Sequence, residues 1–124
     1  MLNKVVMQGR LTKTPELRQT ANGIPFTGFS LAVDRNYRKD EEKPQTDFFD
    51  VICWQARAEV VAKYFTQGQQ MCVEGRLQQR KWTDREGVSR YAVEIIAESV
   101  HFAGYKKNEE PDNGGFDPFA EVAA

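Results

Sequence analysis

The sequence has few residues of the kinds that build metal or redox centres. Its 124 residues include two cysteines, Cys53 and Cys72, and one histidine, His101. The cysteines lie in separate strand-like runs without CxxC spacing, so that with a single histidine they make no credible metal site. We interpret both cysteines as small buried hydrophobic residues. The sequence therefore predicts no metal and no other cofactor.

Long hydrophobic runs and catalytic motifs are also missing. No apolar stretch approaches membrane-spanning length, and no charged start is followed by an apolar segment as in a signal peptide, so we expect a cytoplasmic protein without a membrane partner. The sequence has no paired acids in an apolar setting, no serine-centred elbow and no glycine-rich phosphate loop. These absences argue against an enzyme.

Charge is distributed unevenly along the chain, although the net charge is only −1. All 17 lysines and arginines lie in residues 1–107, which carry +4, whereas residues 108–124 hold five acids and no base and carry −5. A basic body beside an acidic tail indicates a domain that binds a polyanion.

The length suits one domain, which we place at residues 1–105. Residues 106–124 form a short acidic tail, predicted to be disordered because it is charged, rich in glycine and without periodicity.

The segment from Asp47 to Trp54 is rich in aromatic and β-branched residues and is predicted to be a strand. Alternation places its side chains in two sets on opposite faces: Phe49, Val51 and Cys53 on one, and Phe48, Asp50, Ile52 and Trp54 on the other. The first set is typical of a core. Both sets cannot face one small core, so we expect the face with Phe48 and Trp54 to be exposed and able to stack on flat ligands.

The remaining patterns predict a small β-barrel. The expected strands are residues 3–11, 26–35, 47–54, 70–77 with an outward continuation to 82, and 90–97, and the expected helix is 56–66. Residues 12–25 and 36–46 are read as loops. Five strands with one helix between the third and the fourth favour an all-β OB-fold, a five-stranded partly open barrel, although an SH3-like barrel stays possible.

The last two strands are expected to face the core along most of their length. The inward residues are predicted to be Met71, Val73, Gly75 and Leu77, then Tyr91, Val93 and Ile95. Val100 and Phe102 extend the final strand or begin a last packed segment.

Aromatic and basic residues alternate in a way that suits single-stranded nucleic acid, which needs flat rings for its bases and cations for its phosphates. The candidate stacking residues are Tyr37, Phe48, Trp54 and Trp82. The candidate phosphate contacts are Lys4, Arg10, Arg35, Arg38, Lys39, Arg57, Arg76, Arg80 and Lys81. Each ring taken alone could equally be a core residue, since buried aromatics are common in small domains.

Over residues 2–104 the sequence resembles the bacterial single-stranded DNA-binding proteins. The resemblance is carried by residues 3–12, 15–18, 29–33, 46–54, 58–64, 73–77, 80–84 and 91–94, and by Gly87. The start of the chain and the segment 31–36 look most like members from low-GC Gram-positive bacteria and their phages. The resemblance implies an OB-fold that assembles as a homotetramer and binds single-stranded DNA, on the nucleoid, in replication, recombination and repair. The four candidate rings and most of the candidate cations match the family's binding positions.

Two features depart from the family pattern. Asp50 places an acid on the strand that carries Phe48 and Trp54, so we expect it at an edge or paired with an arginine. Family members commonly end on an acidic tip closing with Pro-Phe, which recruits replication and repair enzymes, but here Asp117-Pro118-Phe119 is followed by five more residues. We therefore favour a plain disordered tail.

The alternative function is an accessory OB-fold protein of the primosome type, which binds protein partners or RNA.

Overall fold

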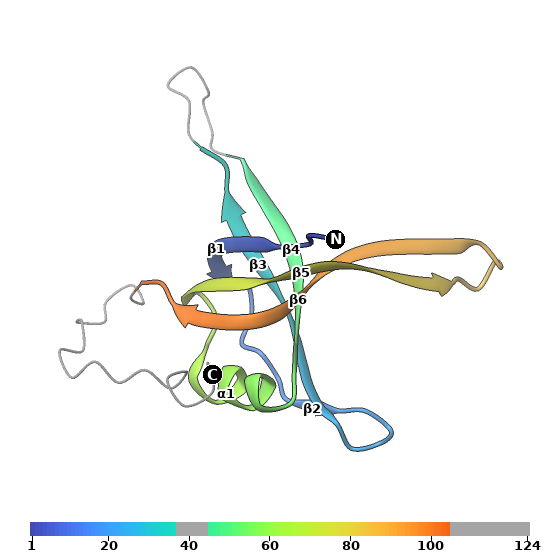
Figure 1. Ribbon diagram of the computed structural model, residues 1–124, viewed down its shortest axis with the longest axis horizontal. Helices are drawn as coiled ribbons and strands as arrows, with labels where there is room; N and C mark the ends of the chain where they lie inside the picture. Colours follow the sequence, from blue (N-terminus) through green and yellow to red (C-terminus); the bar gives the residue numbers. More distant parts are fainter. Residues whose placement is uncertain (37–44, 105–124) are drawn as a thin grey trace.

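The computed structural model describes residues 1–36 and 45–104, shown in colour in Figure 1. The elements are β1 (Val5–Leu11), β2 (Arg18–Gln19), β3 (Pro25–Asp34), β4 (Thr46–Trp54), α1 (Ala56–Tyr64), β5 (Gln70–Thr83) and β6 (Ser89–Phe102). The helix lies between the third and fourth long strands, as predicted. Tyr37, Arg38, Lys39 and the acidic tail from residue 106 lie outside the described residues.

The strands form one sheet that closes on itself. Its order is β1-β5-β6-β4-β3-β2, and β1 also pairs with β3 at Arg10 and Leu11. The β4–β6 pairing is parallel and short, joining Val51 with Ile95 and Ile52 with Ile96, while the other pairings are antiparallel. The ring of five long strands, with α1 at one end of it in Figure 1, is an OB-fold.

The core consists of the inward residues of each strand and one side of the helix. Its fully buried members include Leu31, Val51, Val61, Met71, Val73 and Ile95. Cys53 is also fully buried, and this burial raises the pKa of its thiol to about 12, as expected for an unreactive core cysteine. Cys72 is half-buried. The predicted inward face of β4 is thus confirmed.

The hairpin of β5 and β6 differs from the prediction. Each strand is 14 residues long, and they remain paired from Met71 and Phe102 to Thr83 and Ser89. Figure 1 shows the distal half projecting far beyond the barrel. Leu77, Tyr91 and Val93, which were predicted to face the core, are therefore 44%, 59% and 55% exposed. Alternation indicates which residues share a face, but not where a strand leaves the barrel.

The segment between β1 and β3 also contains a strand that the prediction missed. Arg18 and Gln19, expected to lie in a loop, form β2 and pair with Phe26 and Pro25 at the start of β3. A two-residue strand between turn-forming residues has no periodicity by which the sequence could reveal it.

Gly75 lies where the β5–β6 register shifts, and it leaves no space for a side chain. A Cβ atom there would collide with the backbone carbonyl oxygen of Ile96, whereas a Cβ on Gly28 would meet only the terminal methyl of Ile52, at 3.1 Å. We expect Gly75→Ala to lower the free energy of unfolding by about 1–3 kcal/mol or more, because backbone cannot move aside as a side chain can. Gly28→Ala is the matched control. Urea unfolding at one protein concentration measures both, and equal stability of the two variants would contradict the prediction.

Candidate nucleic-acid interface

The outer face of β4 carries two exposed rings, as its alternation predicted. Phe48 is 66% exposed and Trp54 is 40% exposed. The β3 residues that pair with the outward side chains of β4 are mostly small. Gly28 pairs with Ile52, Ser30 with Asp50 and Ala32 with Phe48. A flat ligand can therefore approach the sheet closely between the two rings.

A depression of about 440 Å³ lies at the Trp54 end of this face. Its lining residues are Lys13, Arg18, Phe26, Gly28, Phe29, Ser30, Asp50, Val51, Ile52, Trp54, Arg80 and Glu94. The Phe26 and Trp54 rings lie 5.4 Å apart between centroids and are tilted by 34°. Aromatic rings beside three cations suit a nucleotide, which offers a flat base and a phosphate.

The backbone after Trp54 holds this ring in place. The next residue, Gln55, has a φ of 58°, so the chain turns sharply into α1. Its N–H donates a hydrogen bond to the carbonyl oxygen of Pro25 at 2.8 Å, which ties the end of β4 to the start of β3. The left-handed conformation at a residue other than glycine is costly and stays only where the surroundings enforce it.

The projecting hairpin carries a ring and a cation on each of its faces. Arg80 lies over the Trp82 ring at 4.9 Å, and Lys81 lies over the Tyr91 ring at 5.4 Å. Trp82 is 42% exposed and was predicted as a stacking residue. Tyr91 was missed because it was assigned to the core. In the structure it pairs with Lys81 beyond the barrel, a position that no local pattern in the sequence reveals.

Several predicted phosphate contacts are already engaged by acids. Lys4 pairs with Glu74 at 2.6 Å, Arg10 with Asp34 at 3.2 Å, and Arg35 with Asp47 at 2.8 Å. The hydrogen bond from Lys4 lowers the pKa of Glu74, and that from Arg35 lowers the pKa of Asp47. These pairs are largely exposed, and exposed ion pairs stabilise a fold only weakly, so an arriving phosphate can displace the carboxylate.

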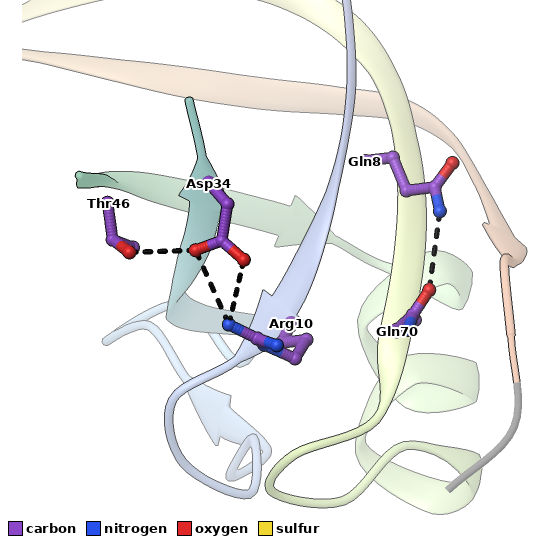
Figure 2. A network of polar contacts seen from close by, with 5 residues as sticks. All are labelled: Gln8, Arg10, Asp34, Thr46 and Gln70. Carbon is purple, nitrogen blue, oxygen red and sulfur yellow. Dashed lines mark hydrogen bonds and ion pairs between the residues drawn. The ribbon is translucent and has the colours of Figure 1, made fainter. Parts of the chain in front are cut away.

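Figure 2 shows what the Arg10 pair does for the barrel. Asp34, at the end of β3, accepts hydrogen bonds from Arg10 of β1 and from Thr46 of β4, the latter at 2.7 Å. Beside it, Gln8 donates to Gln70 at 3.3 Å and connects β1 to β5. Arg10 therefore helps to close the ring of strands in addition to being a candidate phosphate contact.

The other predicted cations are more scattered. Arg80 lines the depression and pairs with Glu94 at 3.7 Å, whereas Arg76 donates to Gln78 at 2.6 Å on the hairpin. Arg57 is half-buried in the first turn of α1. Lys13 and Arg18 line the depression but were not predicted, because they lie in a segment read as a loop with no ring beside them in the sequence.

Of the two expectations for Asp50, the edge position agrees with the structure and the arginine partner does not. Asp50 pairs with Ser30 of β3, whereas β4 pairs with β6 only at Val51 and Ile52, so Asp50 lies where the open edge of β4 begins. Asp50 is exposed, and within residues 1–36 and 45–104 it forms no ion pair. Instead its side chain lines the depression next to Trp54. A sequence pattern shows on which face a residue lies, but the pairing order of the strands decides whether that face lies at an edge.

Residues 1–36 and 45–104 contain neither a metal-binding cluster nor a membrane-spanning helix. No group of three or more histidine, cysteine, aspartate or glutamate side chains there could hold a metal ion. No helix there is long and apolar enough to cross a membrane.

Comparison with known families settles what kind of protein carries this face. The model of the single-strand binding protein family matches residues 2–103. The chain belongs to this family. The family match confirms the resemblance found in the sequence and places both the exposed rings and the projecting hairpin inside the family's domain.

Curated relatives agree with this assignment. The chain is 41% identical to a single-stranded DNA-binding protein of Bacillus cereus over 93% of its own length, and 42% identical to single-stranded DNA-binding protein A of Bacillus subtilis over 93%. It is 40% identical to single-stranded DNA-binding protein 2 of Staphylococcus aureus over 89%. The matched region is 64% and 63% of the two Bacillus proteins, a little under two thirds, and 79% of the Staphylococcus protein.

The tip of this family member's hairpin depends on one carboxylate. Asp84 accepts hydrogen bonds from the backbone N–H groups of Glu86 and Val88, at 3.0 and 2.9 Å, and from Arg90 at 3.0 Å. The Val88 N–H, followed by Arg90 and the Glu86 N–H, holds the pKa of Asp84 below its usual value of 3.8. Ionised Asp84 thus organises the turn that joins the strands carrying Trp82 and Tyr91.

We expect Asp84→Ala to raise amide exchange at Val88 several-fold, whereas Asp84→Asn, which keeps one acceptor oxygen, has a smaller effect. Because the folded pKa is lowered, the stabilising contribution is present above the unfolded pKa near 4 and is lost as the pH falls through the folded value. Hydrogen-exchange NMR measures both effects. Unchanged exchange in Asp84→Ala would show that the turn holds without the carboxylate.

Proposed function

We propose that this protein binds single-stranded DNA without sequence specificity and protects it, as a binding module rather than an enzyme. The observation that carries the proposal is the outer face of β4, where Phe48 and Trp54 stay exposed while the opposite face of the same strand is buried in the core. Membership of the single-strand binding family supports it. So do the relatives of the same domain, which are named as single-stranded DNA-binding proteins.

In this proposal bases stack on Phe48, Trp54 and Trp82, and Tyr37 contributes a fourth ring. Phosphates are held by the predicted cations, to which the depression adds Lys13 and Arg18. Each stacked base contributes about 1–3 kcal/mol, and every base has a flat face, so stacking gives affinity without sequence readout. The Coulombic part releases counterions and therefore weakens with salt.

We also propose that the protein acts in replication, recombination and repair, on the nucleoid in the cytoplasm, and that it assembles as a homotetramer. Support for assembly comes from β1. Among the described residues, Val5–Gly9 pair only with β5, which leaves the other edge of this segment open, and Val6 is 66% exposed beside it. An open edge is able to pair with a second copy of the strand. The proposal treats residues 1–105 as the binding domain and assigns no partner to residues 106–124.

The test is tryptophan fluorescence during titration with poly(dT). Stacking should quench Trp54 and Trp82, which are the only tryptophans in the sequence. Parallel titrations with RNA and with duplex DNA should give weaker binding. Tighter binding to RNA would favour the accessory OB-fold alternative, and the absence of both quenching and a gel shift would exclude the proposal.

A second measurement separates stacking from charge. Trp54→Ala should weaken binding by about 1–3 kcal/mol, or roughly 5- to 150-fold in Kd. At high salt this loss should exceed that of Arg57→Ala, because the ions screen the Coulombic contribution but not the stacking. Thermal unfolding of both variants serves as the control for folding. The reverse order at high salt would show that stacking on Trp54 is minor.

A further inference from the structure

The depression beside Trp54 contains a group that phosphate binding does not explain. Two of its lining residues are acids, Asp50 and Glu94, although the ligand proposed for it is a polyanion. Glu94 has an ion-pair partner, since Arg80 lies 3.7 Å from its carboxylate and its side chain is only 13% exposed. Asp50 is exposed and has no ion pair in the described part of the chain. It is therefore the carboxylate available to a ligand.

The strand pairings place Asp50 on the same outward face as Trp54, and both side chains line the depression. Asp50 lies four residues before Trp54 along β4 and shares its outward face, opposite Ser30. On the other side, the parallel pair of Val51 with Ile95 puts Glu94 next to Asp50 on that same face. Trp54 and Asp50 line the same depression, so a base that stacks on Trp54 and fills the depression can turn its edge toward the Asp50 carboxylate.

A carboxylate accepts hydrogen bonds and cannot donate them. Cytosine offers it an exocyclic amine, and acceptance from this amine is a recognised carboxylate contact. Thymine presents a carbonyl oxygen at the same position, which the carboxylate repels. The charge costs affinity toward phosphate, and a base offsets this cost when its exocyclic N–H reaches the carboxylate, as the cytosine amine can and the thymine carbonyl oxygen at the same position cannot.

Resting on the proposed function, we propose that the depression is a base-selective subsite, in which Asp50 favours cytosine over thymine by accepting a hydrogen bond from the exocyclic amine. The stacking residues bind any base, and Asp50 adds a preference at one position of the strand. The protein is then non-specific as a whole but biased at this subsite.

The experiment compares the affinities for oligo(dC) and oligo(dT) of equal length, at neutral pH and one salt concentration. The quantity of interest is the Kd for dT divided by the Kd for dC. We expect Asp50→Asn to lower this ratio about fivefold, the low end of discrimination by a base contact. Asp47→Asn is the matched control, because it removes the same charge from the same strand outside the depression and should leave the ratio unchanged.

A change in the DNA tests the same contact in the unaltered protein. Oligomers of 2-pyrimidinone keep the cytosine ring but lack its exocyclic amine. The wild-type chain should therefore bind them more weakly than oligo(dC), whereas Asp50→Asn should bind the two oligomers equally. The wild-type measurement does not depend on whether the variant folds.

The outcomes distinguish the two proposals. If wild type binds neither oligomer, the proposed function itself fails. If it binds both and Asp50→Asn leaves the ratio unchanged, or raises both affinities equally, the carboxylate only repels phosphate and the subsite proposal is overturned. Equal binding of cytosine and 2-pyrimidinone oligomers by wild type overturns it as well.

Discussion

The rest of the structure depends on one constraint, which is that a small barrel can bury only one face of each strand. In β4 that face is Val51 and Cys53, fully buried against α1 and the other strands. Phe48 and Trp54 are consequently left outside. Leaving such large rings in solvent has no benefit for folding, since apolar area buried is what stabilises a core. Their exposure is therefore the strongest sign of a binding face.

Charge serves two purposes on this protein. Arg10, Lys4 and Arg35 each bridge neighbouring strands through an acid, and Figure 2 shows how the Arg10–Asp34 pair helps to join β1 to β3. Because such exposed pairs are weak, the same cations can change partners when phosphates arrive. Asp50 differs from the acids of these pairs, because no cation in the described residues holds it. It is the acid most able to influence which base is bound.

The hairpin extends the surface beyond what a closed barrel offers. Past the pair of Gln78 with Glu94 both faces of β5 and β6 meet solvent, so a ring and a cation can be placed on each face. The hydrogen-bonded ladder of 14-residue strands keeps the arm ordered without a core beneath it, and Asp84 closes its tip. The proposed binding surface thus has two parts. The barrel determines the geometry of the sheet face, and the turn determines the geometry of the arm.

Most of the architecture and the rings on β4 and β5 could be predicted from the sequence, because alternation and the helical period are local properties of the chain. Local patterns could not show where β5 and β6 leave the barrel, so Leu77, Tyr91 and Val93 were placed in the core. They also could not show which strands become neighbours. The ion pairs of Arg10 and Lys4 were therefore missed, as were the positions of Lys13, Arg18 and Asp50 in the depression. The sequence by itself determined which side chains share a face. Only the tertiary structure decided which faces meet, because strand pairing and barrel closure join residues far apart in the chain.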